Sequence, residues 1–253
     1  MKTLFVGQNR IHLQSVDSTN SYATEMLRQI SLPDGTLFYS FNQQNGRGQR
    51  GNEWESEPMK NVALSYVLYP KFMDANKQFL LTKVIALGVA DLLTAIFKNE
   101  SIVAEVKVKW PNDIYVNNQK IAGVLIENTI RDSLVQSSIV GIGINVNQSY
   151  FKNNPKATSL SRICGKEFDL ETIIVHLSEC IEANYLQLKT NKQNLIDTNY
   201  LKVLYRLNQL ATYKVENSLI EATIIGVSSA GLLQVKFADD TIIEFDFKKI
   251  EFI

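Results

Sequence analysis

The chain has 253 residues, enough for one large domain or for a main domain with a small one beside it. Hydrophobic residues make up 45% and charged residues 21%, as in a globular protein with a sizeable core. The 26 basic and 26 acidic residues balance, so no global field recruits nucleic acid, and two cysteines make neither a disulfide framework nor a zinc pattern. The N-terminus lacks a signal-peptide pattern, and no apolar run approaches the ~20 residues of a membrane span. These features predict a cytoplasmic protein with neither a nucleic-acid partner nor a membrane partner.

The first part of the chain alternates strand-like and helix-like segments. Expected strands are 2–6, 11–16, 36–41, 61–69, 106–110, 114–116, 121–127 and 139–147. A helix should follow the capping residues at 17–20, and another should cover 76–97, because apolar residues recur there at helical spacing. This pattern predicts an α/β (α+β) domain, a mixed sheet backed by helices.

A loop-rich stretch, 148–168, is followed by helices expected at 169–189 and 193–207. The sequence pattern changes after them. Short apolar runs with tight turns then predict a small β-module. Its expected strands are 213–215, 220–227, 232–237, 241–245 and 249–252. We therefore expect a main domain over 1–208 and an SH3-like β-barrel over 209–253.

Residues 43–54 are the first candidate for a binding site, because 46–51 contain three glycines and two arginines. Glycine lets backbone approach a ligand closely, and arginine presents a rigid fork of donors for phosphate or carboxylate. The glycine spacing matches a dinucleotide fingerprint, but a polar stretch ending at Pro58 follows in place of a helix, and no Gly-Lys-Ser/Thr follows as in a P-loop. The loop is either an anion-binding loop or a solvated surface loop, and other motifs must decide.

Three other segments are unusual for purely structural elements. Lys120 begins a strand, where it is either functional or an edge charge that discourages aggregation. Gly123 inside that strand indicates either a bulge or close approach of another group to the backbone. The run 139–147 carries two glycines and two asparagines, which suggests that something packs against its backbone.

Five motifs in order make the chain resemble biotin–protein ligases over nearly its whole length. They are Ser18-Thr19-Asn20, then Gly46-Arg47-Gly48-Gln49-Arg50-Gly51 with Trp54, then Lys109-Trp110-Pro111-Asn112-Asp113, then Lys120-Ile121-Ala122-Gly123 with Glu127, then Gly141-Ile142-Gly143-Ile144-Asn145-Val146-Asn147. Regulatory members carry a helix-turn-helix domain before the first motif. Only 17 residues precede Ser18, so the sequence resembles the monofunctional form without that DNA-binding domain.

The resemblance implies a class II synthetase-like fold and a two-step reaction. Biotin and ATP first give biotinyl-adenylate and pyrophosphate, with Mg²⁺ shielding phosphate charge and no metal ligands assigned. The biotinyl group then passes to a lysine of a biotin carboxyl carrier protein domain. The family pattern leaves open whether the protein is a monomer or a homodimer.

Carried over motif by motif, the resemblance also assigns residue roles. The catalytic residues would be Lys120, bridging the biotin carboxylate and the α-phosphate, Arg47, holding anionic oxygens, and Asp113, orienting the incoming lysine. The biotin-binding residues would be Ser18, Thr19, Asn20, Gln43, Gly46, Arg47, Lys120 and Gly123. The ATP-binding residues would be Arg47, Arg50, Trp54, Asn112, Lys120 and Asn145, with Trp54 covering the adenine.

Two alternatives remain beside this interpretation. A lipoate–protein ligase shares the fold and the adenylation chemistry, but the complete loop ending at Trp54 and the Lys-Trp-Pro-Asn-Asp motif argue against it. A biotin- or nucleotide-binding regulator without catalysis would not require Lys120 and Asp113 together. Many members carry a basic residue at the place of Gln49, which bears on how firmly the loop retains the adenylate.

Overall fold

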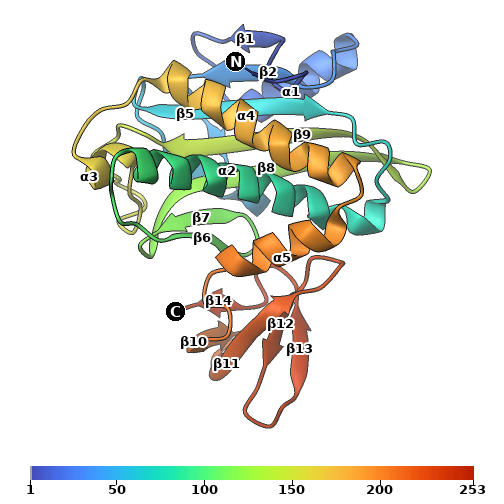
Figure 1. Ribbon diagram of the computed structural model, residues 1–253, viewed down its shortest axis with the longest axis vertical. Helices are drawn as coiled ribbons and strands as arrows, with labels where there is room; N and C mark the ends of the chain where they lie inside the picture. The colour runs from blue at the N-terminus through green and yellow to red at the C-terminus, as the bar shows by residue number, and fades with distance from the viewer. Residues whose placement is uncertain (1) are drawn as a thin grey trace.

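The computed structural model describes residues 2–253, apart from the side chain of Arg50. A seven-stranded mixed sheet forms the centre of the protein, with the strand order β1-β2-β5-β9-β8-β7-β6 (Figure 1). Its strands are β1 (Arg10–His12), β2 (Thr36–Ser40), β5 (Asn61–Leu68), β6 (Val106–Lys109), β7 (Asp113–Val116), β8 (Gln119–Arg131) and β9 (Leu134–Asn145). Only the β1–β2 pair within this sheet is parallel.

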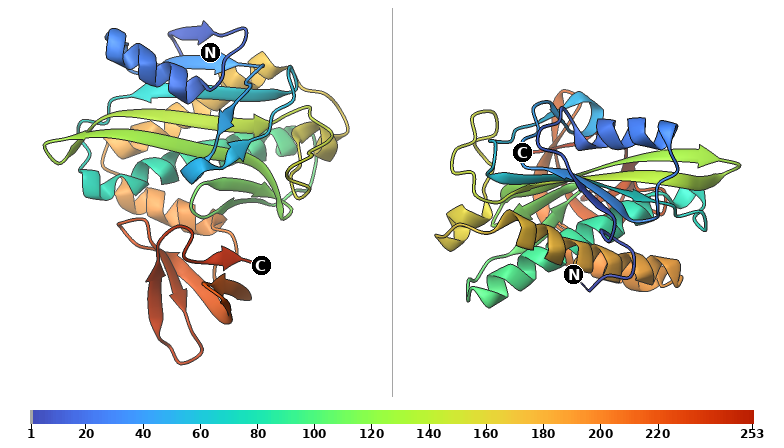
Figure 2. Two further views of the ribbon diagram at one scale, coloured as in Figure 1. Left: turned by 180° about the vertical axis from the view of Figure 1, so that it is seen from behind. Right: turned by 90° about the horizontal axis from the view of Figure 1, so that it is seen from above.

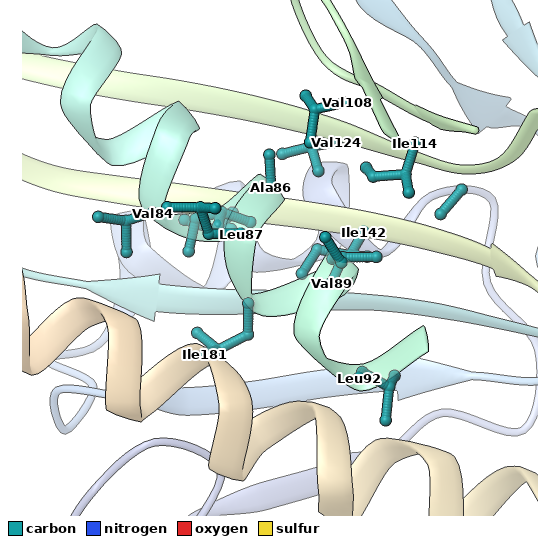
Figure 3. Close-up of a cluster of buried hydrophobic side chains, with 14 of the residues drawn as sticks. Val84, Ala86, Leu87, Val89, Leu92, Val108, Ile114, Val124, Ile142 and Ile181 are labelled. Atoms are coloured by element: carbon teal, nitrogen blue, oxygen red, sulfur yellow. The ribbon is translucent and has the colours of Figure 1, made fainter. Parts of the chain in front are cut away.

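Helices cover both faces of this sheet. α2 (Phe79–Asn99) and α4 (Leu170–Lys189) lie side by side on one face, while α1 (Thr19–Gln29) lies on the other (Figure 2). Apolar side chains of α2, such as Val84 and Val89, lie in the buried core between the sheet and α4 (Figure 3). Ile181 of α4 packs against Gly88 of α2. This arrangement confirms the expected mixed sheet backed by helices.

α2 is also apolar enough to be tested as a membrane helix. By length and composition the stretch Ala75–Asn99 could cross a bilayer, with a mean hydropathy of 2.0. However, 67% of its most apolar window is buried inside the protein, as expected for the core helix between the sheet and α4.

The prediction of a strand at 2–6 is wrong. The backbone N–H groups of Leu4, Phe5 and Val6 donate to the buried carboxylate of Glu182 on α4, at 2.6 to 3.0 Å. A carboxylate thus takes the place of a neighbouring strand. The next strand is shorter than the expected 11–16, because only Arg10–His12 pairs with β2.

The central hairpin is longer than expected. β8 extends past both ends of the expected run 121–127, whereas β9 begins before the expected run 139–147 but ends at Asn145. The two strands meet at Asp132 and Ser133, both at positive φ. Polar residues dominate these extensions, so the apolar runs in the sequence did not predict them. The loop-rich stretch also contains a short helix, α3 (Leu160–Cys164), that the sequence did not indicate.

A second, antiparallel sheet follows α5 (Gln193–Val203), which ends four residues before the expected 207. Leu204 leaves the helix to form a bridge beside Val108 of β6, which explains the early end. The five strands are β10 (Leu210–Val215), β11 (Ser218–Val227), β12 (Leu233–Lys236), β13 (Ile242–Phe245) and β14 (Glu251–Phe252), in the order β13-β12-β11-β10-β14. They fit the expected small barrel-like module, and the division at 208/209 stays a prediction.

Candidate active site

A cavity of about 670 Å³ lies on the α1 face of the main sheet. This volume is typical of sites for small molecules. Four segments wall it: the start of α1 at 18–20, the loop 43–54, the stretch 109–113 with Lys120, and the C-terminal strip 247–252. The segments are far apart in the sequence, so the fold brings them together.

Most of the site residues expected from the sequence line this cavity. They are Ser18, Thr19, Asn20, Gln43, Arg47, Trp54, Asn112, Asp113, Lys120 and Gly123. Gly46 and Asn145 lie behind the lining, and the side chain of Arg50 lies outside the described residues. The structure therefore brings together the motifs that the sequence singled out separately.

A buried polar cluster closes one end of the cavity. Ser18 caps α1, and the next residue, Thr19, donates from its backbone N–H to Gln43 Oε1 at 2.9 Å. Ser65 Oγ on β5 lies 2.6 Å from Asn20 Oδ1 and 2.8 Å from Thr19 Oγ1. The start of α1 therefore does more than cap a helix, because it aims fixed polar groups into the cavity.

Three glycines leave part of the cavity floor as sheet backbone without side chains. Gly123 of β8 and Gly143 of β9 face each other across the ladder, and Gly141 lies two residues before Gly143. The Asn20 amide covers Gly141, where an added Cβ would lie 2.9 Å from Cγ. The Trp54 indole covers the other two glycines. The expectation that something packs against these backbones is confirmed.

The loop 43–54 has a structure of its own. β3 (Gly46–Arg47) pairs with β4 (Glu53–Trp54) around a 3-10 turn, η1 (Gln49–Gly51). Within the part of the chain that the structure describes, Trp54 Nε1 is buried and has no hydrogen-bond partner. Trp54 therefore anchors the loop on the glycine floor with an unpaired donor. Mobility of the loop without ligand stays a prediction.

Two cations of the site are paired with carboxylates of the same chain. Lys120 Nζ lies 2.5 Å from Asp113 Oδ1, and Arg47 Nη2 lies 2.8 Å from Glu127 Oε1. Glu127 also accepts a hydrogen bond from Asn20 Nδ2 at 2.8 Å, which ties this pair to the polar cluster. The Lys120 ammonium lies 5.7 Å from the Trp54 ring centroid. An anionic ligand would meet both cations in one place.

The backbone of Lys120 is held by the loop that precedes α3. Its N–H donates to Lys156 O at 3.1 Å, and its carbonyl accepts from the Thr158 N–H at 2.8 Å. Asn145 Nδ2 in turn donates to Thr158 O at 3.0 Å. Among the described residues, Asn145 Oδ1 is buried and has no hydrogen-bond partner, which leaves one strong acceptor behind the lining.

The sequence did not identify two parts of the cavity wall. Lys109 was only part of a motif, yet its Nζ lies 3.1 Å from Tyr115 Oη and 4.9 Å from the Phe252 ring centroid. Burial, partly offset by Asp113, lowers the pKa of the Lys109 amine below its usual value. The strip 247–252 was also missed, because no sequence pattern says how the C-terminal sheet docks. The alternation of 106–110 was the available signal for Lys109.

Among the described residues, no group of three or more His, Cys, Asp and Glu side chains could hold a metal ion. The cavity thus combines the hydrogen-bonding groups at the start of α1 with two paired cations and with aromatic side chains, of which Trp54 lies beside Lys120. Such a site can bind an elongated anionic molecule and stabilise negative charge.

Comparisons with known proteins agree with this geometry. Residues 12–145 match the Biotin/lipoate A/B protein ligase family. Among curated relatives, the bifunctional ligase/repressor BirA of Bacillus subtilis (strain 168) is 34% identical over 195 residues, which are 76% of this chain and 58% of the relative. The biotin--[acetyl-CoA-carboxylase] ligase of Paracoccus denitrificans is 36% identical over 135 residues, 53% of each chain.

Solved structures extend the likeness to the whole fold. The biotin protein ligase from Aquifex aeolicus in complex with biotin and ATP is similar with a TM-score of 0.77 and 28% identity. The match covers 96% of this chain and 98% of that one. The chain thus spans 58% of the Bacillus relative and nearly all of the Aquifex protein.

Proposed function

This chain belongs to the biotin/lipoate A/B protein ligase family, and from that premise we propose that it is a biotin–protein ligase. It would activate biotin with ATP and transfer the biotinyl group to a lysine of a biotin carboxyl carrier protein domain. One observation carries the proposal: Lys120 and Arg47 lie in one cavity with the polar cluster of α1 and with Trp54. The Aquifex protein, which the chain matches over nearly its full length, binds biotin and ATP.

The first step joins two anions, so it requires positioning and positive charge more than an acid and a base. A biotin carboxylate oxygen attacks the α-phosphorus of ATP, a new P–O bond forms, and pyrophosphate leaves. Lys120 would bridge the carboxylate and the α-phosphate, and Arg47 would hold anionic oxygens beside it. Both cations already lie at the cavity, which lowers the cost of assembling them around the reacting atoms.

The buried polar cluster suits the ureido ring of biotin. Thr19 and Gln43 are fixed by hydrogen bonds to each other, Ser18 Oγ accepts from the Ser21 N–H, and Asn20 is held by Ser65. Gly46 leaves no room for a side chain, since a Cβ there would lie 2.7 Å from Gln43 Nε2. This end of the cavity would therefore take the biotin head, with the valerate chain running toward Lys120 past the Trp54 indole that covers Gly123.

The nucleotide would occupy the other end. Trp54 would cover the adenine with its ring. Asn145 lies behind the lining and would support the phosphate or adenine position from there, since its buried Oδ1 has no partner among the described residues. Asn112 would lie near the phosphates, its Nδ2 being held by Val124 O at 2.7 Å. Arg50 is assigned to the phosphates from the motif alone.

Magnesium fits this donor set as a companion of the substrate. Mg²⁺ usually keeps several waters and binds through phosphates with one or two carboxylates, so a dedicated protein cage is not needed. Asp113 would supply the protein carboxylate. When bound, the ion supplies charge neutralisation on the phosphates.

In the second step the carrier lysine amine attacks the biotinyl carbonyl, an amide forms and AMP leaves. Asp113 would orient that amine and accept its proton. The Paracoccus and Mycobacterium tuberculosis relatives are biotin--[acetyl-CoA-carboxylase] ligases, which supports a carboxylase carrier as the partner. A cytoplasmic location, the lack of DNA binding and the choice between monomer and homodimer stay predictions.

The test is incubation of the protein with biotin, Mg²⁺-ATP and a biotin carrier domain, read by intact mass. We expect the carrier to gain one biotinyl group, and Lys120→Ala to abolish most of that gain. Lys107→Ala is the matched control, because Lys107 lies on β6 of the same sheet, pairs with Glu105 and does not line the cavity. Modification with lipoate but not biotin, or full activity of Lys120→Ala, would overturn the proposal.

A further inference from the structure

Trp110 joins the two sheets of the molecule at the cavity. Its ring is 4% exposed and lines the cavity directly after β6. Its Nε1–H donates to the backbone carbonyl of Gly231 at 2.9 Å, and its ring meets Phe247 edge-on with 6.4 Å between centroids. Gly231 and Phe247 both belong to the C-terminal module, so one side chain of the main domain holds two parts of that module.

The turn that Trp110 holds fits in one position. Gly231 has φ +89°, and a Cβ on it would lie 2.6 Å from Phe79 Cγ at the start of α2. The turn between β11 and β12 is therefore confined between the Trp110 indole and the Phe79 ring. A donor on one side and a ring on the other fix both its distance and its direction.

The same module supplies the wall at one end of the cavity. Phe247, Ile250 and Phe252 line it, and Phe252 lies against Lys109. In the sheet order, β6 and β7 are at the opposite edge from β1 and β2, whereas α1 contacts β5 and β9 (Figure 1). The C-terminal wall thus faces the nucleotide end, away from the polar cluster that would hold biotin.

We propose that Trp110 is a positioning residue for the nucleotide: its indole N–H fixes the C-terminal module so that the strip 247–252 closes the nucleotide end of the cavity. Its backbone leads directly into Asn112 and Asp113, so the wall and these two side chains are placed by one residue. This inference rests on the proposed ligase function. The free energy of a single neutral hydrogen bond is too small to decide whether the protein folds. It is large enough to change measurably the fraction of molecules in which the strip 247–252 is docked at the cavity.

Trp110→Phe tests the role because it keeps an aromatic ring and removes the N–H. We expect KM for ATP to rise about five- to tenfold, the size of one lost neutral hydrogen bond, while biotin affinity and the unfolding temperature stay near wild type. Hydrogen exchange should quicken in 228–232 and 247–252 but not in β9. A merely structural role would weaken biotin and ATP binding together.

Tyr200→Phe is the matched control. Tyr200 is fully buried near Phe79, and its hydroxyl has no hydrogen-bond partner among the described residues. Removing that hydroxyl also takes away one polar group from an aromatic side chain, yet it should leave KM for ATP unchanged. Gly231→Ala approaches the same junction from the Phe79 side and should reproduce the split if Trp110→Phe does not fold.

The outcomes separate the two claims. Wild-type protein that forms no adenylate overturns the ligase function, while the exchange comparison still decides whether Trp110 fixes the module. Active wild type with an unchanged KM for ATP and unchanged exchange in Trp110→Phe overturns the positioning role. Equal losses for biotin and ATP overturn it as well.

Discussion

Replacing Gly143 by alanine should expel the Trp54 indole from the cavity floor. A Cβ on Gly143 would lie 2.7 Å from Trp54 Cζ2 and 2.8 Å from Nε1, well inside ordinary contact. The strand cannot retreat, because Gly143 pairs with Ala63 of β5 on one side and with Gly123 of β8 on the other. The indole and the loop that carries it must move instead.

The size of this displacement follows from the close contact between the added Cβ and the Trp54 indole. Overpacking of this kind costs about 1–3 kcal/mol, which corresponds to a shift of roughly 5- to 150-fold against the seated indole. A Cβ on Gly123 would lie 3.2 Å from Trp54 Cζ3, so Gly123→Ala should show a smaller shift in the same direction. Affinity for the adenylate should fall in the same order, because the displaced ring is the one assigned to the adenine.

Tryptophan fluorescence reads the displacement, since Trp110 is the only other tryptophan in the sequence. Emission should shift to the red and acrylamide quenching should increase in Gly143→Ala. Gly226→Ala is the control: it is also a strand glycine, but its nearest neighbour is the flexible end of Gln234, at 3.1 Å. Unchanged emission, quenching and adenylate affinity in Gly143→Ala would refute the packing argument.

Three more predictions concern the charged groups. Lys120→Ala should slow adenylate formation about 10²–10³-fold. Given chemically made biotinyl-adenylate, Lys120→Ala should recover much of its transfer activity, whereas Asp113→Ala should recover less. Adenylate formation by Lys120→Ala at the wild-type rate would contradict the assignment. Glu127→Gln should weaken the hold on Arg47, which keeps its hydrogen bond to Ser21 Oγ, at a cost of at most about 1 kcal/mol. The loop without ligand should then be cleaved faster by protease, and equal cleavage would exclude this restraint. Burial lowers the pKa of Lys109 in the folded protein, so the unfolded chain binds more protons between that value and the usual lysine value, and stability rises with pH across this window. Lys109→Met should therefore stabilise the protein at neutral pH, and denaturant titrations should show the gain vanishing above the usual lysine pKa; a gain independent of pH would exclude this cause.

The sequence predicted the elements whose side chains repeat regularly. α2 and α4 follow from their apolar periodicity, and Ser18 caps α1 as expected, accepting from the Ser21 N–H. The strand predicted at 2–6 does not form, because its backbone N–H groups donate to the carboxylate of Glu182, which lies more than 170 residues away in the sequence. Such a partner cannot be found from local pattern.

The candidate site was likewise predictable only in part. Five motifs converge on one cavity because each carries residue types that are awkward for structure alone, such as the glycines facing Trp54. The C-terminal wall was not predictable, since Phe252 looks like any strand residue until the module docks. Asn145 lies behind the lining, and only the structure shows its acceptor without a partner.

The two ion pairs of the site suggest an order in which a ligand engages its cations. The Arg47 and Glu127 side chains are 50% and 34% exposed, whereas Lys120 and Asp113 are 24% and 23% exposed. A solvated pair gains little from its mutual attraction, so an incoming anion can recruit Arg47 at small cost. The less exposed pair is screened less and costs more to open. Arg47 should therefore capture the anion first, and Lys120 should exchange Asp113 for it only when the loop has excluded water. That order leaves Asp113 unpaired beside the new adenylate, where the second step needs a carboxylate.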